Sequence, residues 1–161
     1  IDSYSIALGT EYVIAFCHKG IDLYRHIHLA DKSRPPLIVG INAGYLILTD
    51  ELDQARVSGS ITLWENKQTS ANIIKLVYKR LDCFINDRES TLWQLKQIQK
   101  KQPDINFGHI YEAMLVQTNT AHIGYSRRGD EKYPFKQDFV TKMNAALTRL
   151  LSASKTDVTK Y

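Results

Sequence analysis

The chain contains the stretch Leu-Ile-Val-Gly-Ile-Asn-Ala-Gly-Tyr at residues 37–45, an apolar run that ends in a short polar turn. The continuous run from Leu37 to Ile41 is typical of a strand that is buried on both faces. The turn at residues 42–44 leads into a segment with helical spacing at residues 46–57. This order of strand, turn and helix predicts an α/β unit. The sequence on either side continues the alternation of strands and helices.

The same alternation continues along the rest of the chain. Further strands are predicted at residues 11–17, 61–64, 81–85, 105–107, 112–117 and 122–125, the last two separated by a polar turn at residues 118–120. Further helices are predicted at residues 20–30, 68–79, 89–100 and 135–151. Alternating strands and helices predict an α/β fold, with a mostly parallel sheet and helices on both of its faces.

Length and composition are those of an ordinary globular protein. The chain has 161 residues, 43% hydrophobic and 24% charged, with a formal net charge of +4. No apolar run approaches the ~18 residues of a membrane span. The chain begins at Ile1 without a methionine or a signal peptide, so we expect a mature or trimmed product. The mild positive charge does not by itself predict nucleic-acid binding.

The two cysteines, Cys17 and Cys83, both lie in apolar runs. Two cysteines do not make a disulfide framework, so we expect two buried free thiols. A disulfide is possible only if the two strands that carry them are neighbours.

Three predicted strands end in polar turns that lead into helices, at residues 42–45, 66–70 and 86–89. In open α/β sheets ligands bind at such corners, where helix N-termini offer free N–H groups. Asp87 follows a strand directly, and its carboxylate can hold an ammonium group of a ligand. Spacing alone favours the simpler interpretation that Asp87 is the N-cap of the next helix.

Three other residues at these corners are candidate ligand contacts. Gly44 lets the backbone approach a ligand closely, although an ordinary turn glycine is the simpler interpretation. Tyr45 can shield a ligand or merely pack against its neighbours. Thr69, like Ser70, is a capping residue first and a ligand donor second.

The sequence patterns of common enzymes and metalloproteins are missing. It has no G-x-S-x-G elbow, P-loop or G-x-G-x-x-G fingerprint. The histidines, cysteines and carboxylates do not complete a zinc-binding set, so we predict no metal and no cofactor. The lysines of residues 96–101 have no interleaved aromatic residues, which disfavours a nucleic-acid groove.

Three stretches, residues 4–20, 37–45 and 79–87, together resemble the family-3 bacterial extracellular solute-binding proteins. These are the periplasmic amino-acid-binding components of ABC transporters, with a type 2 periplasmic-binding fold. The close of the chain, residues 143–161, is also similar to the family's C-terminal helix and tail. The resemblance covers the C-terminal two-thirds of that fold. It implies a crossover from lobe 1 at residues 1–10, lobe 2 at residues 11–118, and a hinge strand with C-terminal helices at residues 119–161.

The resemblance also implies a function and a site. Asp87 matches the family's acidic residue that binds the ligand α-amino group, and Gly44 and Tyr45 match the corner that helps hold the ligand carboxylate. The sequence departs from the family there, since Thr or Ser often stands at the position of Tyr45. Lys79 also replaces a usual glycine. The implied protein is a periplasmic, monomeric, non-enzymatic binder of an amino acid or similar small polar solute.

Its implied partner is the membrane permease of an ABC transporter. No nucleic-acid partner is expected. Three alternatives stay open: the input domain of a membrane receptor, a same-fold enzyme such as a dehydratase or a lytic transglycosylase module, and a domain that has lost ligand binding.

Overall fold

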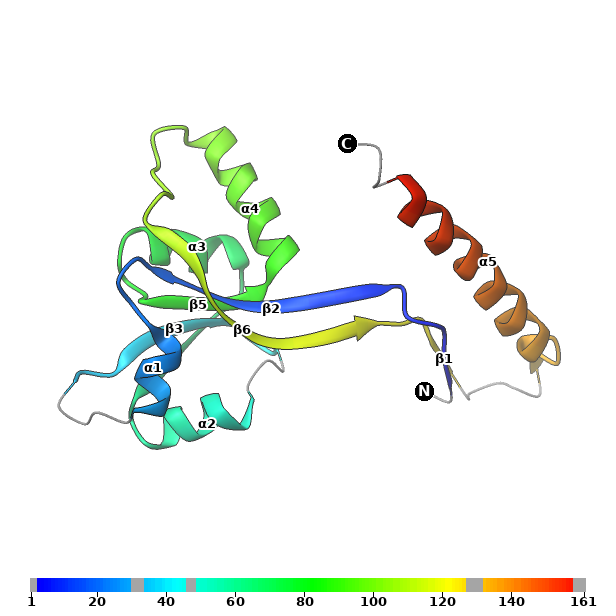
Figure 1. The fold of residues 1–161 in the computed structure, drawn as a ribbon, viewed down its shortest axis with the longest axis horizontal. Helices are drawn as coiled ribbons and strands as arrows, with labels where there is room; N and C mark the ends of the chain where they lie inside the picture. Colours follow the sequence, from blue (N-terminus) through cyan, green and yellow to red (C-terminus); the bar gives the residue numbers. More distant parts are fainter. Residues whose placement is uncertain (1–2, 30–33, 46–48, 127–131, 158–161) are drawn as a thin grey trace. The chain divides into compact units, whose positions relative to one another are not determined.

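The computed structural model describes residues 3–29, 34–45, 49–126 and 132–157 (Figure 1). The chain divides into two compact units. The larger unit is Glu11–Asn119, and the smaller unit consists of Ile1–Thr10 with Thr120–Tyr161. No helix among the described residues is both long and apolar enough to cross a membrane.

The larger unit is built on a five-stranded sheet with the order β4-β3-β5-β2-β6. Its strands are β2 (Gly9–His18), β3 (Leu37–Asn42), β4 (Ile61–Asn66), β5 (Cys83–Asp87) and β6 (Ile110–Ala121). Strand β3 runs parallel to both β4 and β5. Strand β2 runs antiparallel to β5, with Val13 opposite Asp87 and Cys17 opposite Cys83. The predicted α/β class is confirmed, in a sheet whose β4-β3-β5 part is parallel.

Helices cover both faces of this sheet, as Figure 1 shows. They are α1 (Leu23–His28), α2 (Asp50–Val57), α3 (Thr69–Val77) and α4 (Arg88–Lys101). One core cluster joins α1 and α2 to the sheet through the buried Leu23 and Leu52. A second cluster joins α3 and α4 to the opposite face through Ile73, Leu76 and Ile98. The two clusters fix the parallel strands between two layers of helices.

Gly40, in the middle of β3, allows α3 to approach the strand closely. A Cβ atom at this position would lie 2.9 Å from Oδ1 of Asn72 and would overlap the side chain of Leu81. Both of these side chains are fully buried, so neither has room to move away. The glycine of the apolar run is therefore needed for packing of α3 against β3.

The smaller unit contains a short antiparallel pair and one long helix. Strand β1 (Ser3–Tyr4) pairs with β7 (Gly124–Tyr125), and α5 spans Lys136–Asp157. The N–H of Ile6 donates to Oδ1 of Asn144 at 3.2 Å, which ties α5 to the segment after β1.

Three predicted secondary-structure features are wrong. No turn forms at residues 118–120, because their threonines suit a strand and β6 continues to Ala121. Residues 105–107 do not pair as a strand, and Ile105 and Phe107 instead pack against the second core cluster. Neither Thr69 nor Ser70 caps α3, whose N-cap is Gln68 without a side-chain hydrogen bond. The predicted helix at residues 46–57 begins at Asp50, capped by Thr49, and residues 46–48 lie outside the described residues.

The expectation of two free thiols is also wrong. Cys17 and Cys83 form a disulfide between β2 and β5. The antiparallel register places them directly opposite each other, with their Cα atoms 4.1 Å apart. The sequence could not show that these two strands are neighbours, since 66 positions separate the cysteines.

Candidate functional site

The three parallel strands end at the same edge of the sheet, and each ends in or next to an asparagine. Asn42 closes β3, Asn66 closes β4, and Asn86 is the penultimate residue of β5. Asn42 and Asn66 are directly opposite in the register of β3 and β4. The corners predicted as candidate ligand contacts are therefore brought together, because parallel strands present their carboxyl ends at one edge.

Buried amide groups connect these corners. We call the connected set the asparagine network; its members are Asn42, Asn66, Asn72, Asn86, Thr69 and Thr91. Nδ2 of Asn42 donates to Oγ1 of Thr69 at 2.9 Å and to Oδ1 of Asn86 at 3.2 Å. Nδ2 of Asn86 donates onward to Oγ1 of Thr91 at 3.0 Å. One side chain, Asn42, thus links the corners of β3 and β5 with the start of α3.

Asn72, on α3, closes the network from the helix side. Its Nδ2 donates to Oδ1 of Asn42 at 2.9 Å and to the carbonyl of Ile41 at 3.1 Å, and its Oδ1 accepts from Nδ2 of Asn66 at 2.6 Å. Asn72 is fully buried, so these bonds replace water completely. Lys75 of the same helix donates to Oδ1 of Asn66. The polar groups beneath the corners are held in place by mutual hydrogen bonds.

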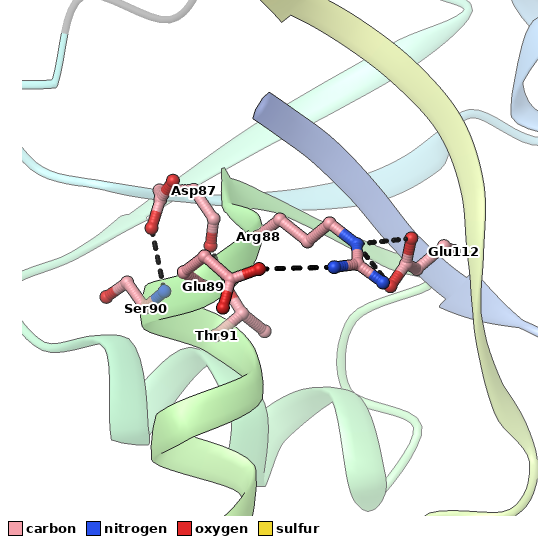
Figure 2. A network of polar contacts seen from close by, with 6 residues as sticks. All are labelled: Asp87, Arg88, Glu89, Ser90, Thr91 and Glu112. Carbon is pink, nitrogen blue, oxygen red and sulfur yellow. Dashed lines mark hydrogen bonds and ion pairs between the residues drawn. The ribbon is translucent and has the colours of Figure 1, made fainter. Parts of the chain in front are cut away.

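Asp87 is the N-cap of α4, as Figure 2 shows. Its Oδ1 accepts from the N–H of Ser90 at 2.7 Å, and its carbonyl accepts from Oγ1 of Thr91 at 2.8 Å. The second carboxylate oxygen has no hydrogen-bond partner among the described residues. The capping role that spacing favoured is present, and half of the carboxylate stays available.

The cation next to Asp87 is already neutralised. Nε of Arg88 lies 2.9 Å from the carboxylate of Glu112, and its Nη1 lies 3.2 Å from Glu89 (Figure 2). The hydrogen bond and the charge of Glu112 raise the pKa of Arg88 above its ordinary value. Asp87 itself forms no ion pair with a described residue, so within this corner only the N–H groups at the start of α4 offset its negative charge.

The structure places the other predicted site residues differently. Gly44 has φ of +80°, and a Cβ atom there would meet nothing within 4 Å, so the glycine serves the turn conformation. The N–H of Tyr45 already donates to the carbonyl of Asn42 at 3.2 Å, and its side chain is exposed. Thr69 accepts from Asn42 but donates to no described residue, so its hydroxyl proton is available.

Sequence reasoning missed most of the network. Asn42, Asn66 and Asn86 lay inside the predicted corners, but the residues weighed as contacts were Asp87, Gly44, Tyr45 and Thr69, and of these only Thr69 belongs to the network. The repeated asparagine at the end of three strands was a usable signal. Asn72 could also have been noticed, because it lies four positions before Leu76 on the apolar face of α3, where a polar residue needs buried partners.

Two hollows on the surface of the larger unit differ in position: one lies near the corner of Asp87 and the other lies away from it. One of about 310 Å³ is lined by Tyr12, Ile14, Arg88, Glu112 and Leu115, beside the start of α4. Another, of about 340 Å³, lies at the amino end of β3 and belongs to a different edge of the sheet. No cluster of three histidine, cysteine or carboxylate side chains that could hold a metal ion occurs within the described ranges.

Neither a protein-family model nor a curated protein sequence matches this chain. Solved structures do match it. A mutant of the arginine-binding protein of T. maritima aligns with a TM-score of 0.58 and 14% identity, over 97% of this chain and 58% of that one. An arginine-bound amino acid ABC transporter substrate-binding protein of Streptococcus pneumoniae aligns with a TM-score of 0.59 and 11% identity, over 96% and 57%.

A third match is an ancestral amino acid-binding protein described as a precursor of cyclohexadienyl dehydratase. It aligns with a TM-score of 0.53 and 11% identity, over 94% of this chain and 60% of that one. The chain thus spans less than two thirds of the length of these proteins. Over the part of these proteins that it spans, the chain has their periplasmic-binding-like fold, which its sequence had led us to expect.

Proposed function

We propose that this chain captures an amino acid or a similar small polar solute at the carboxyl edge of β3, β4 and β5, as part of an extracytoplasmic solute-binding protein that serves an ABC-type permease. The observation that carries the proposal is Asp87. It is an ordered carboxylate with one free oxygen and no cationic partner among the described residues. A ligand ammonium group would supply the missing positive charge.

The hydrogen bonds that hold Asp87 in place favour binding, because its side chain then loses little conformational entropy when a ligand contacts it. The bond from the N–H of Ser90 fixes one carboxylate oxygen, and the bond from Thr91 fixes the peptide behind it. Thr91 is itself buried and bound to Asn86. A contact that is already oriented loses little on binding.

The anionic end of the ligand has donors on the neighbouring corner. The hydroxyl of Thr69 accepts from Asn42, which leaves its proton free for an acceptor on the ligand. The first turn of α3 has no side-chain cap, and the N–H groups of Thr69 and Ser70 donate to no described residue, whereas that of Ala71 donates to the carbonyl of Gln68. These donors take over the role that the resemblance gave to Gly44 and Tyr45, since the N–H of Tyr45 is already occupied.

The disulfide between Cys17 and Cys83 supports an extracytoplasmic location. Disulfides form and persist in oxidising compartments and are rare in the cytosol. This observation is independent of the likeness to transport proteins.

Titration of the chain with L-arginine and L-glutamine, followed by NMR shifts of the backbone amides, tests the proposal. A chain that spans only part of a two-lobed binder should bind weakly, and NMR detects millimolar affinity. We expect shifts at the corners after β3, β4 and β5. The variant Asp87→Asn keeps the N-cap, because asparagine caps as well as aspartate, but removes the charge and should weaken binding at least about tenfold.

The matched control is Asp104→Asn, which makes the same charge change at an exposed residue beyond the end of α4. Equal affinity of Asp87→Asn and wild type would contradict the role of Asp87. Absence of binding to a wider panel of amino acids, at the millimolar concentrations that a weak site requires, would contradict solute capture by this chain.

A further inference from the structure

Two histidines pack face to face at the end of the sheet opposite to the asparagine network. His18 is the last residue of β2, and His109 precedes β6. Their rings are stacked with centroids 5.1 Å apart and planes 8° from parallel. His18 is only 8% exposed. The stack joins residues 102–109 to β2, together with a hydrogen bond from the N–H of Lys19 to the carbonyl of His109 at 2.8 Å.

Three of the four ring nitrogens of this pair lack hydrogen-bond partners within the described part of the chain. Nδ1 and Nε2 of His18 and Nε2 of His109 are buried and bond to no described residue. Stacked imidazole rings pack well while both are neutral, since their faces are apolar. A positive charge on His18 would be offset only by the peptide carbonyls of Leu76 and Leu81, which do not outweigh its burial and the neighbouring His109, so protonation in the closed state is unfavourable.

The charged groups around the pair do not offer compensation. On the α3 side the ammonium of Lys79 opposes a charge on His18, and on the other side His109 does the same. At the start of β5, Asp82 uses its carboxylate to accept from the N–H of Ile38 at 2.7 Å. Only the peptide carbonyl of Asp82 is directed to β2, where it accepts from the N–H of His18 at 3.2 Å.

The same surroundings act on the titration of His18. Burial lowers its pKa first, and the neighbouring His109 lowers it further. The peptide groups of Leu76 and Leu81 act in the opposite direction, and Lys79 lowers it again, for a net decrease below the ordinary value of 6.5.

We propose that the stacked pair of His18 and His109 is an acid-sensitive latch, which holds residues 102–109 against the sheet while His18 is neutral and releases them when His18 is protonated. The neighbouring disulfide keeps β2 joined to β5, so the opening stays local. Ile105 and Phe107 pack against the second core cluster from this segment, and release exposes them. The latch concerns the edge of the sheet opposite to the proposed ligand site and does not depend on that function.

The direction of the pH effect follows from the lowered pKa. The opened state binds a proton on His18 more readily than the closed state does. The closed state is therefore favoured fully above pH 6.5, and it is progressively lost as the pH falls below that value. The loss continues until the pH passes the lowered pKa of the closed state.

Hydrogen exchange of the whole chain with its disulfide intact, read by mass spectrometry at pH 7.5 and 5.5, tests the latch. After correction for the intrinsic pH dependence of exchange, protection of the peptide covering residues 102–110 should fall about tenfold per pH unit for each proton taken up on opening. Peptides from β3 should keep their protection. The variant His18→Phe keeps an aromatic ring against His109 and removes the group whose pKa is lowered, so its protection should change little with pH.

The matched control is His28→Gln, which removes an exposed histidine of α1 and should behave as wild type does. The same pH response in His18→Phe and wild type would overturn the proposal. If His18→Phe does not fold, NMR titration of the wild-type imidazoles tests the proposal instead. A ring signal of His18 that titrates at or above pH 6.5, with no simultaneous change at residues 102–109, would overturn it equally.

Discussion

The two ends of strand β5 bury polar side chains in opposite ways. At its carboxyl end, Asn86 shares hydrogen bonds with Asn42 and Thr91. At its amino end, Cys83 is bonded to Cys17, and the neighbouring His18 has no partner for either ring nitrogen. One end satisfies its polar groups with uncharged amides, and the other combines a covalent bond with two titratable rings.

Because of this difference, the carboxyl end is rigid, whereas the state of the amino end depends on pH and on the redox environment. Amides do not titrate, so the corner that carries Asp87 keeps its geometry at any moderate pH and in any redox state. Imidazoles and disulfides respond to acid and to reductant respectively. The carboxyl end is therefore suited to presenting a preformed contact, and the amino end to changing state.

Loss of the disulfide should have the largest effect. The double variant Cys17→Ala/Cys83→Ala frees a loop of 66 positions, and the entropy of closing such a loop is worth about 4 kcal/mol of unfolding free energy. Urea unfolding measures it, with wild type in a thiol reductant as a second route to the same state. A decrease below about 1 kcal/mol in both would mean that the amino end of β5 does not depend on its covalent bond.

Removal of Asn72 should come next. The variant Asn72→Ala leaves Oδ1 of Asn42, the carbonyl of Ile41 and Nδ2 of Asn66 without this partner. Unmet buried groups cost about 1 to 3 kcal/mol each, and partial relaxation makes a total of about 3 kcal/mol reasonable.

The same urea measurement applies to this variant. Asn106→Ala serves as control, since Asn106 is exposed and its side chain bonds, among the residues that the structure describes, only to the N–H of Gly108. Equal stability of the two variants would show that the carboxyl end is not held by its amides.

The order of strands and helices could be predicted because each segment carries its own pattern. The apolar run at residues 37–41 and the spacing of α3 both depend on local sequence. Neighbouring strands could not be predicted, because pairing of β2 with β5 is decided by contacts far apart in the chain. The disulfide was missed for that reason, and the continuous β6 was missed because polar threonines also occur in turns.

The candidate site was predictable to a similar extent. The rule that ligands bind at the carboxyl ends of parallel strands located the three corners, and the capping preference of aspartate located Asp87. The bonds among Asn42, Asn72 and Asn86 required the register of three strands and a helix. The stacked histidines lie 91 positions apart in the numbering of the chain, at ends of elements with no common pattern.

A smaller effect is expected at the N-cap of α4. Replacement of Asp87 by alanine removes the bond to the N–H of Ser90, and loss of a cap typically costs about 1 kcal/mol. Asp87→Asn should keep most of this stability, so thermal unfolding of the two variants separates capping from charge. A loss in Asp87→Asn as large as in Asp87→Ala would mean that the charge, rather than the cap, stabilises the helix.

The smallest change in stability should follow Glu112→Gln. The ion pair between Arg88 and Glu112 is exposed to solvent, where salt screens it and side-chain entropy opposes it, so the unfolding midpoint should stay within measurement error at physiological salt.

Ligand binding by Glu112→Gln should change more than its stability does. Without Glu112 the guanidinium of Arg88 is free to turn toward Asp87 and compete with a ligand ammonium group. The titration with L-arginine should then show weaker binding, by a few-fold, while Glu89→Gln, which removes the more exposed of the two partners, should have less effect. A variant that lost stability but kept its affinity would reverse this reasoning, because it would make Arg88 part of the scaffold rather than a cation held away from the site.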